Sequence, residues 1–292
     1  MSLTGRVATL GGLVLGGLAV DWPGWHRIGI RPAWQAGFYL DALTYLVSVV
    51  GILIIYRRLG EGVRPVEERG NRSGLVVSLR SGWRYAARTP PVLFVYAAVL
   101  ALVVAGAGFI ILYVPLIQGG APAGGFGLGT RGVGFVAGIG STGLILSAAA
   151  YGLIGHRLAR TTAMLAGFLV LGGVAVALPF VRSFALLAPL VFVGGLALTP
   201  LYIAMDTLLH ETVLAEARGR VFANREWLTH LAFGAGALVI GQLTRLAGHR
   251  QVLFAIGLLV LGLTGAGFFA AARVRRWQDE RHIPNPETQE AT

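Results

Sequence analysis

Cysteine and lysine are both absent from the sequence, and only 13% of its 292 residues are charged. The absence of cysteine excludes a disulfide, a thiol nucleophile and a metal site built on cysteine. Neither an HExxH nor a GxSxG motif occurs, and no apolar segment carries a pair of carboxylates. Because the histidines and acids are not clustered as ligands either, nothing in the sequence supports an enzyme. We therefore assign no catalytic, cofactor-binding or metal-binding residue.

Apolar side chains dominate the sequence: they make up 55% of the chain, and the mean hydropathy is +0.71. They recur in runs of about 20 residues, the length at which an α-helix crosses a bilayer. A soluble core cannot hide so many of these runs, whereas lipid can. We therefore expect an all-α integral membrane protein, a polytopic helical bundle of about eight transmembrane helices.

The expected spans are separated by polar or glycine-rich connections and lie at roughly 3–20, 35–56, 92–117, 132–154, 162–181, 184–205, 227–246 and 252–272. The first span is short, with Gly12 and Gly16 on one face. It is either a retained helix that packs through these glycines or a signal peptide. Pro200 is placed to kink the sixth span, because proline interrupts the hydrogen-bond ladder of a helix.

Arginine alone supplies the positive charge, since all 24 basic residues are arginine and the net charge is +11. Eighteen arginines lie in the N-terminus, the C-terminal tail and the connections after the second, fourth and sixth spans, against six in the remaining connections. By the positive-inside rule, this bias predicts a multi-pass protein of the plasma (inner) membrane with both termini in the cytoplasm. Arginines clustered between spans, rather than along one amphipathic face, argue against nucleic acid as a partner.

One polar stretch, 57–88, interrupts the apolar runs and holds eight of the arginines. In its second half apolar residues recur at helical spacing, while Arg80, Arg84 and Arg88 stack four apart on another face. This pattern predicts an amphipathic helix on the inner membrane surface. The resulting division gives two transmembrane helices in 1–56, a cytoplasmic connector in 57–91, six transmembrane helices in 92–272 and a cytoplasmic tail in 273–292.

Ionisable residues inside spans are candidates for function, because each costs about 2.5–3.5 kcal/mol to insert. Asp41 in the second span is either a proton or substrate carboxylate or an acid steadied at a helix N-terminus by the interface. Asp206 ends the sixth span and His230 begins the seventh on the same side, so the two would pair if these spans are neighbours. Such a pair would serve either as a gate or proton relay, since histidine titrates near neutral pH, or as a structural ion pair.

The connection between those two spans mixes both signs of charge in Glu211, Glu216, Arg218, Arg220, Arg225 and Glu226. A cytoplasmic network of ion pairs among these residues would hold two helices together in one conformational state. Breaking and remaking that network would bias alternating access. The alternative is that the arginines only set the topology of the chain.

Three segments carry a resemblance to a known family: SLRSGWRYAARTPPV at 78–92, EARGRVFANREWLTH at 216–230 and GAGALVIGQLTRLAG at 234–248. The stretch FYLDALTYLV at 38–47 is similar to the start of the family's sixth helix. Together these segments resemble the branch of the major facilitator superfamily that contains macrolide-efflux and enterobactin-exporter proteins. The resemblance implies that the eight expected spans correspond to helices 5–12 of such a transporter.

The resemblance also implies a function, namely proton-coupled secondary active efflux of small amphipathic molecules by alternating access. The implied partners are the lipid bilayer and a small-molecule substrate whose identity stays open. The chain departs from the family at His156, where the family's loop motif has an Asp, and in having no counterpart of the first four helices.

That second departure makes 1–56 a remnant of an N-terminal half, and a chain truncated in this way is not expected to transport alone. The alternative is a non-transporting half-transporter or membrane complex subunit, for which a second chain supplies the missing helices.

Overall fold

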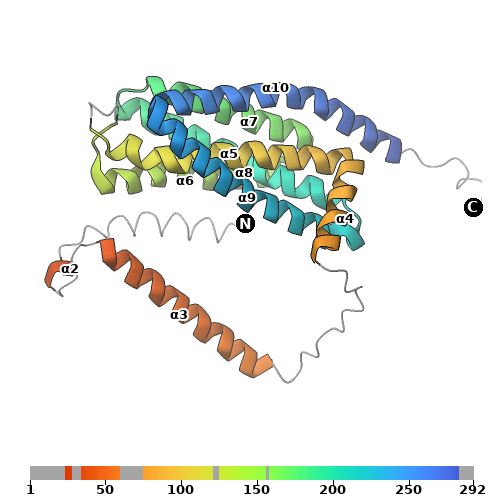
Figure 1. Ribbon diagram of the computed structural model, residues 1–292, viewed down its shortest axis with the longest axis horizontal. Coiled ribbons are helices and arrows are strands. Elements are labelled where there is room, and N and C mark those ends of the chain that lie inside the picture. Colours follow the sequence, from red (N-terminus) through yellow and green to blue (C-terminus); the bar gives the residue numbers. More distant parts are fainter. Residues whose placement is uncertain (1–23, 28–33, 60–74, 121–124, 156–157, 283–292) are drawn as a thin grey trace, which may run out of the picture.

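The computed structural model describes residues 24–27, 34–59, 75–120, 125–155 and 158–282, and every regular element in these ranges is helical (Figure 1). The elements are α2 (Gly24–Arg27), α3 (Trp34–Leu59), α4 (Leu75–Arg88), α5 (Pro90–Gln118), α6 (Gly129–Ile154), α7 (Arg160–Ala177), the 3-10 turn η3 (Leu178–Phe180), α8 (Phe184–Thr212), α9 (Ala215–Ala247) and α10 (His249–His282). Within the described ranges, α3 and α5–α10 are long and apolar enough to cross a membrane. The predicted polytopic helical bundle is confirmed, and the first expected span, 3–20, lies outside the described residues.

The helices extend further than hydropathy predicts. The segment 206–226 was expected to be a polar connection, but α8 runs to Thr212 and α9 begins at Ala215, so only Val213 and Leu214 separate the two helices. Likewise, α10 continues through the arginines of the expected tail. The apolar stretch marks only the part of a helix that lipid covers, whereas the helix ends where its backbone hydrogen bonds end.

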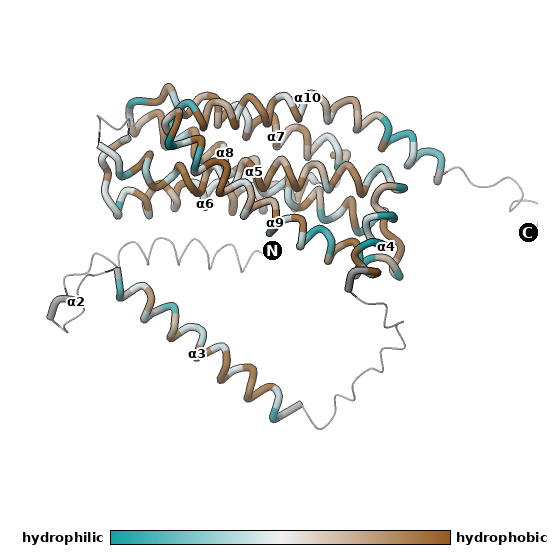
Figure 2. Tube along the Cα trace, in the orientation of Figure 1, coloured by the Kyte–Doolittle hydropathy of each residue, from teal (hydrophilic) through white to brown (hydrophobic). Residues whose placement is uncertain are grey.

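Six helices, α5–α10, form the bundle, and α4 lies across one of its ends (Figure 1). At the centre α5 contacts α8. On one side α6 packs on α8 and α9 packs on α5, while on the other side α7 and α10 pack on each other and on α8 and α5, respectively. Hydrophobic residues follow the length of the bundle and hydrophilic residues gather at its ends (Figure 2). Helix α3 lies apart from the bundle, and the side chains of its apolar stretch are exposed.

The main helix contacts of the bundle repeat, whereas the smaller α5–α6 and α9–α10 contacts have no counterpart of similar size. Exchanging α5, α6 and α7 for α8, α9 and α10 turns the α6–α8 contact into the α9–α5 contact, and the α7–α8 contact into the α10–α5 contact. The α5–α8 and α7–α10 contacts map onto themselves. Because each unit has three helices, the second unit crosses the membrane in the opposite direction to the first. The bundle is therefore built from two inverted three-helix units.

Glycines bring α6 and α8 into backbone contact. A Cβ on Gly195 of α8 would overlap the carbonyl oxygen of Gly140, and a Cβ on Gly143 of α6 would overlap the carbonyl oxygen of Phe192. Any larger residue at Gly143 or Gly195 would push the helices apart. Close approach through small residues is the usual way for helices to associate in lipid, where no hydrophobic force drives them together.

Two hydroxyl groups cross the same interface. Ser147 of α6 donates to the carbonyl oxygen of Leu196 at 2.6 Å, and Thr199 of α8 donates to that of Leu144 at 2.9 Å. The Leu196 carbonyl lies one turn before Pro200. In a regular helix the backbone N–H of residue 200 would donate to this carbonyl, but proline has no N–H. Ser147 therefore satisfies the backbone acceptor that the proline leaves open.

Candidate functional site at the α8–α9 turn

Charged side chains converge where α8 ends and α9 begins. Arg218, in the first turn of α9, donates to the backbone carbonyl of His210 at 3.0 Å and to that of Val213 at 3.3 Å. The carbonyls of the last helical turn lack helical donors and carry partial negative charge. The guanidinium of Arg218 thus caps the C-terminus of α8 and fixes the turn.

An ion pair joins α8 and α9 close to this turn. Arg225 of α9 binds the carboxylate of Asp206 on α8, with the arginine side chain 21% exposed and the aspartate 43% exposed. The guanidinium also lies 5.2 Å from the centre of the Phe222 ring, a cation–π distance. The centre of the His210 ring lies 4.8 Å from the centre of the Phe222 ring. Charge and aromatic contacts therefore hold the end of α8 against α9.

A second ion pair involves α7. Glu211, near the end of α8, accepts a hydrogen bond from Arg160 at 3.2 Å, and Arg160 also donates to the backbone carbonyl of Gly155 at 2.9 Å. One arginine at the start of α7 therefore connects the ends of α6 and α8. We refer to Arg160, Asp206, Glu211, Arg218 and Arg225 as the α8–α9 charge cluster.

The opposite face of α9 holds the amphipathic helix α4. Asn224 is fully buried, and its amide donates to the backbone carbonyl of Leu79 at 2.9 Å. Arg220 donates to the Ser81 hydroxyl at 3.3 Å. Gly82 makes the close approach possible, since a Cβ there would meet the Asn224 amide. The predicted helix in this part of the connector is confirmed, and it docks on α9 at the end that carries the charge cluster.

Tyr96 connects this end to α5. Its hydroxyl is buried and donates to the backbone carbonyl of Val221 on α9 at 2.8 Å, and the ring of Trp83 on α4 meets it edge-on at 5.3 Å. The first three turns of α9 therefore contact α4, α5 and α8. A movement of α9 would change its contacts with all three helices.

The expected pairing of Asp206 with His230 is not formed. Asp206 binds Arg225 instead, and His230 lies one turn further along α9 beside Glu226 at 3.2 Å, with both of those side chains exposed. The expectation required α8 and α9 to run side by side. The two helices meet mainly at their turn and pack on different neighbours, so the histidine does not reach the aspartate.

The other sequence-predicted residues are scattered rather than joined in one network. Arg218 binds backbone carbonyls, Arg220 binds a hydroxyl, and the exposed Glu216 lies with Arg220 around a hollow of about 220 Å³ between α4 and α9. Asp41 is exposed on α3, away from the charge cluster. Pro200 lies inside α8, six residues before Asp206.

Three residues of this region, Arg160, Asn224 and Tyr96, were not predicted from the sequence. Arg160 was counted only for topology, and Asn224 and Tyr96 carry no local signal because their role depends on which helices become neighbours. In the described ranges, no three histidine or acidic side chains are grouped to hold a metal ion.

One overlooked signal was internal similarity. Arg131-Gly132 opens α6 and Arg218-Gly219 opens α9, each followed by a phenylalanine three residues after the glycine. The tetrapeptide LVLG stands at 169–172 in α7 and at 259–262 in α10, beginning nine and ten residues after the helix starts. Both matches pair the helices that the fold exchanges.

Comparison of the sequence with protein-family models and with curated proteins gave no match. The fold and the charge cluster therefore carry what can be inferred about function.

Proposed function

We propose that the bundle α5–α10 is one half of a secondary active transporter of the efflux type, similar to the macrolide-efflux and enterobactin-exporter branch of the major facilitator superfamily. The observation that carries the proposal is the pair of inverted three-helix units. Many secondary transporters are built from such repeats, with the substrate site near the midplane and alternating access by rocking of one half against the other. The substrate class that fits is a small amphipathic molecule.

In this proposal the α8–α9 charge cluster is the cytoplasmic gate. An ion pair that is partly exposed to water contributes only about 0–1 kcal/mol. Pairs such as Arg225–Asp206 and Arg160–Glu211 can therefore break and reform within a transport cycle, whereas a buried pair would lock the helices. The cluster binds the ends of α6, α7, α8 and α9 together, so its loss would let this end open.

Proton coupling would act through Asp206. A proton on its carboxylate removes the negative charge that Arg225 binds and so weakens the contact between α8 and α9. His230 and Asp41 remain further candidates for the proton pathway. Gate opening and proton uptake would then be the same event.

The proposal is tested by deleting the gene in the cells that make the protein and measuring their retention of ethidium, an amphipathic fluorescent cation. Deletion should raise retention, and the wild-type gene should restore efflux that stops when the proton gradient is collapsed. Asp206→Ala should fail to restore it. Equal retention in deleted and complemented cells, across a panel of amphipathic dyes of both charges, would contradict a transport function.

A second candidate is a non-transporting half-transporter or complex subunit that binds another chain. The observation that favours it is the exposure of α9, in which only Val221, Asn224 and Ile240 are buried, together with the exposure of α3. Purification from native membranes in a mild detergent discriminates the two. A second membrane chain present in equal amount would support the subunit, and a lone chain would count against it.

A further inference from the structure

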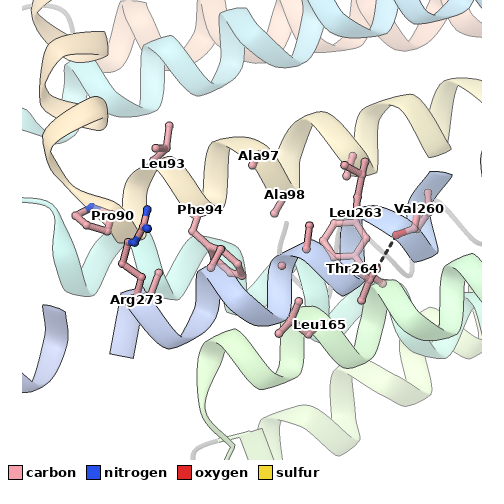
Figure 3. A pocket seen from close by; sticks show the side chains of 16 residues that line it. Pro90, Leu93, Phe94, Ala97, Ala98, Leu165, Val260, Leu263, Thr264 and Arg273 are labelled. Carbon is pink, nitrogen blue, oxygen red and sulfur yellow. Dashed lines mark hydrogen bonds between the residues drawn. The ribbon is translucent and has the colours of Figure 1, made fainter. Parts of the chain in front are cut away.

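A groove of about 320 Å³ lies between α5, α7 and α10 and shares no residue with the charge cluster (Figure 3). Its floor is apolar and buried, with Phe94 from α5 and Leu165 and Phe168 from α7. Thr264 is the polar side chain in the floor, and its hydroxyl donates to the carbonyl of Val260 in its own helix at 2.7 Å. The floor therefore suits hydrocarbon.

Small residues hollow out this groove. Ala97 and Ala101 on α5 face Gly267 and Ala270 on α10, so neither helix fills the space between them. Ala97 and Ala270 are exposed and form the rim, which places the opening on the outer surface of the bundle. A transmembrane bundle meets lipid at that surface, so lipid chains have direct access to the groove.

Arg273 stands at one end. In Figure 3 it lies beside Pro90, at the end of the groove opposite Val260. Within the described part of the chain, no ion pair involves Arg273. Asp279 and Glu280 follow Arg275 and Arg276 by four residues, the spacing that favours helical ion pairs, and are too far along the helix to do the same for Arg273.

The length of the groove matches one lipid leaflet. From Val260 to Arg273 the helix rises about 20 Å at about 1.5 Å per residue. One leaflet is about 20–22 Å deep when its headgroup region is included, half of the roughly 40–45 Å bilayer. A chain lying on the floor would therefore place its headgroup beside the guanidinium. Trp277, one turn further on, belongs to the residue type that lines the headgroup level.

We propose that this groove binds an acyl chain of an anionic phospholipid and that Arg273 binds its phosphate. Basic pockets between transmembrane helices are suited to anionic headgroups, and each arginine near the surface strengthens that attraction. The cavity volume falls within the range of small-molecule sites. The proposal depends on the membrane-embedded bundle and not on transport.

Native mass spectrometry of the purified full chain in detergent tests it, with phosphatidylglycerol and phosphatidylcholine of identical acyl chains as probes. The wild type should retain phosphatidylglycerol more tightly than phosphatidylcholine. Arg273→Gln should weaken phosphatidylglycerol binding about fivefold and phosphatidylcholine binding less, because the choline cation of phosphatidylcholine offsets the charge of its phosphate. Ala270→Leu should weaken both lipids, because the larger side chain fills the groove, and Ala97→Leu does the same from the facing helix if the first variant does not fold.

Two matched controls come from α10 itself. Arg276→Gln removes a neighbouring charge and Ala255→Leu enlarges an exposed residue outside the groove, and neither should change lipid binding. Equal loss of phosphatidylglycerol in Arg273→Gln and Arg276→Gln would mean a diffuse basic surface and overturn the proposal. So would groove-filling variants that lose ethidium binding but keep both lipids, since the groove would then hold a small molecule.

Discussion

At the residue scale, Pro200 interrupts α8 without leaving a buried acceptor unpaired. Its missing N–H frees the carbonyl of Leu196, and the hydroxyl of Ser147 donates to that oxygen. No water in the hydrocarbon core could replace this donor. The serine and the proline therefore act as one unit, although 53 residues separate them in the sequence.

This coupling predicts that the cost of Ser147→Ala depends on the proline. In the native background the substitution should lower the free energy of unfolding by about 0.6–1.7 kcal/mol, the range for hydrogen bonds between membrane helices. In a Pro200→Ala background the new backbone N–H binds Leu196, so the same substitution should cost little. Unfolding in mixed micelles, followed by circular dichroism, gives the four stabilities of this double-mutant cycle.

Thr142→Val provides the control on the same helix, since the Thr142 hydroxyl donates only to the Gly138 carbonyl of α6. Its effect should be the same with proline or alanine at position 200. If Ser147→Ala costs equally in both backgrounds, the serine is a general packing residue and not the partner of the proline.

The pair Asp206–Arg225 yields a prediction about opening of the gate. Because the chain has no cysteine, Val221→Cys places a single, fully buried thiol at the α9–α5 contact. Asp206→Asn in that background should speed labelling by a soluble maleimide up to about fivefold, since a half-exposed ion pair contributes up to about 1 kcal/mol. Exchanging the two charges in one double variant should slow labelling again.

Glu226→Gln is the matched control for this experiment, because it removes a carboxylate whose contact, with His230, joins two exposed side chains of α9. Labelling of the thiol at 221 should not change in that variant. An increase as large as that for Asp206→Asn would assign the effect to net charge rather than to the contact between α8 and α9.

At the element scale, the α6–α8 crossing depends on glycines, and replacing one of them with a larger residue should destabilise the bundle. Gly195→Ala should lower the free energy of unfolding by about 1–3 kcal/mol, because the methyl group meets the Gly140 carbonyl and the helices must separate. Gly173→Ala on α7 makes the same change where no atom lies within 4 Å, and should be neutral or stabilising by up to about 1 kcal/mol. Equal effects of the two, measured by unfolding in micelles, would mean that the helices cross elsewhere.

The positions of these elements were largely predictable from the sequence. Each apolar run in the described ranges became a helix, because lipid leaves the backbone no other way to satisfy its hydrogen bonds. The amphipathic helix followed from the spacing of Arg80, Arg84 and Arg88. The helix ends were not predictable from hydropathy. The segment 206–226 is polar enough to be read as a loop, yet it contains no glycine pair or proline that would stop a helix.

The members of the candidate site, apart from Arg160, were predictable from the sequence, but their contacts were not. Asp206 was identified because an ionisable residue within a span is costly. Arg218 and Arg225 were identified because both signs of charge mix in the connection between two spans. Their partners required knowledge of which helices are neighbours. No sequence pattern marks Asn224 as buried. The ion pair of Arg160 with Glu211 can be inferred only once the start of α7 is known to lie beside the end of α8.

At the scale of the whole molecule, the inverted units explain why α6 and α9 do not pack mainly on the helices next to them in the sequence. Helices α6 and α9 each pack on the first helix of the other unit, α8 and α5, respectively. The repeated Arg-Gly pairs at the starts of α6 and α9 fall at opposite membrane faces in this arrangement. The three-helix inversion therefore predicts that the start of α5 lies on the same side of the membrane as the end of α8.

That statement can be checked with single cysteines in the cysteine-free chain. Ala87→Cys before α5 and Glu216→Cys at the start of α9 should lie in the cytoplasm, while Gly120→Cys after α5 and Ser183→Cys before α8 should lie outside. All four positions are exposed. A membrane-impermeant maleimide added to intact cells should label only positions 120 and 183, and should reach the other two after permeabilisation.

Each alternative outcome has a distinct meaning. Labelling of 87 and 216 alone in intact cells would keep the inverted units but reverse the orientation that the 18 and six arginines predict. Labelling of 87 with 183, or of 120 with 216, would make α5 and α8 parallel and so contradict the inversion on which the proposed transport function depends. Because opposite ends of both helices are sampled, orientation and inversion are tested separately by one set of four variants.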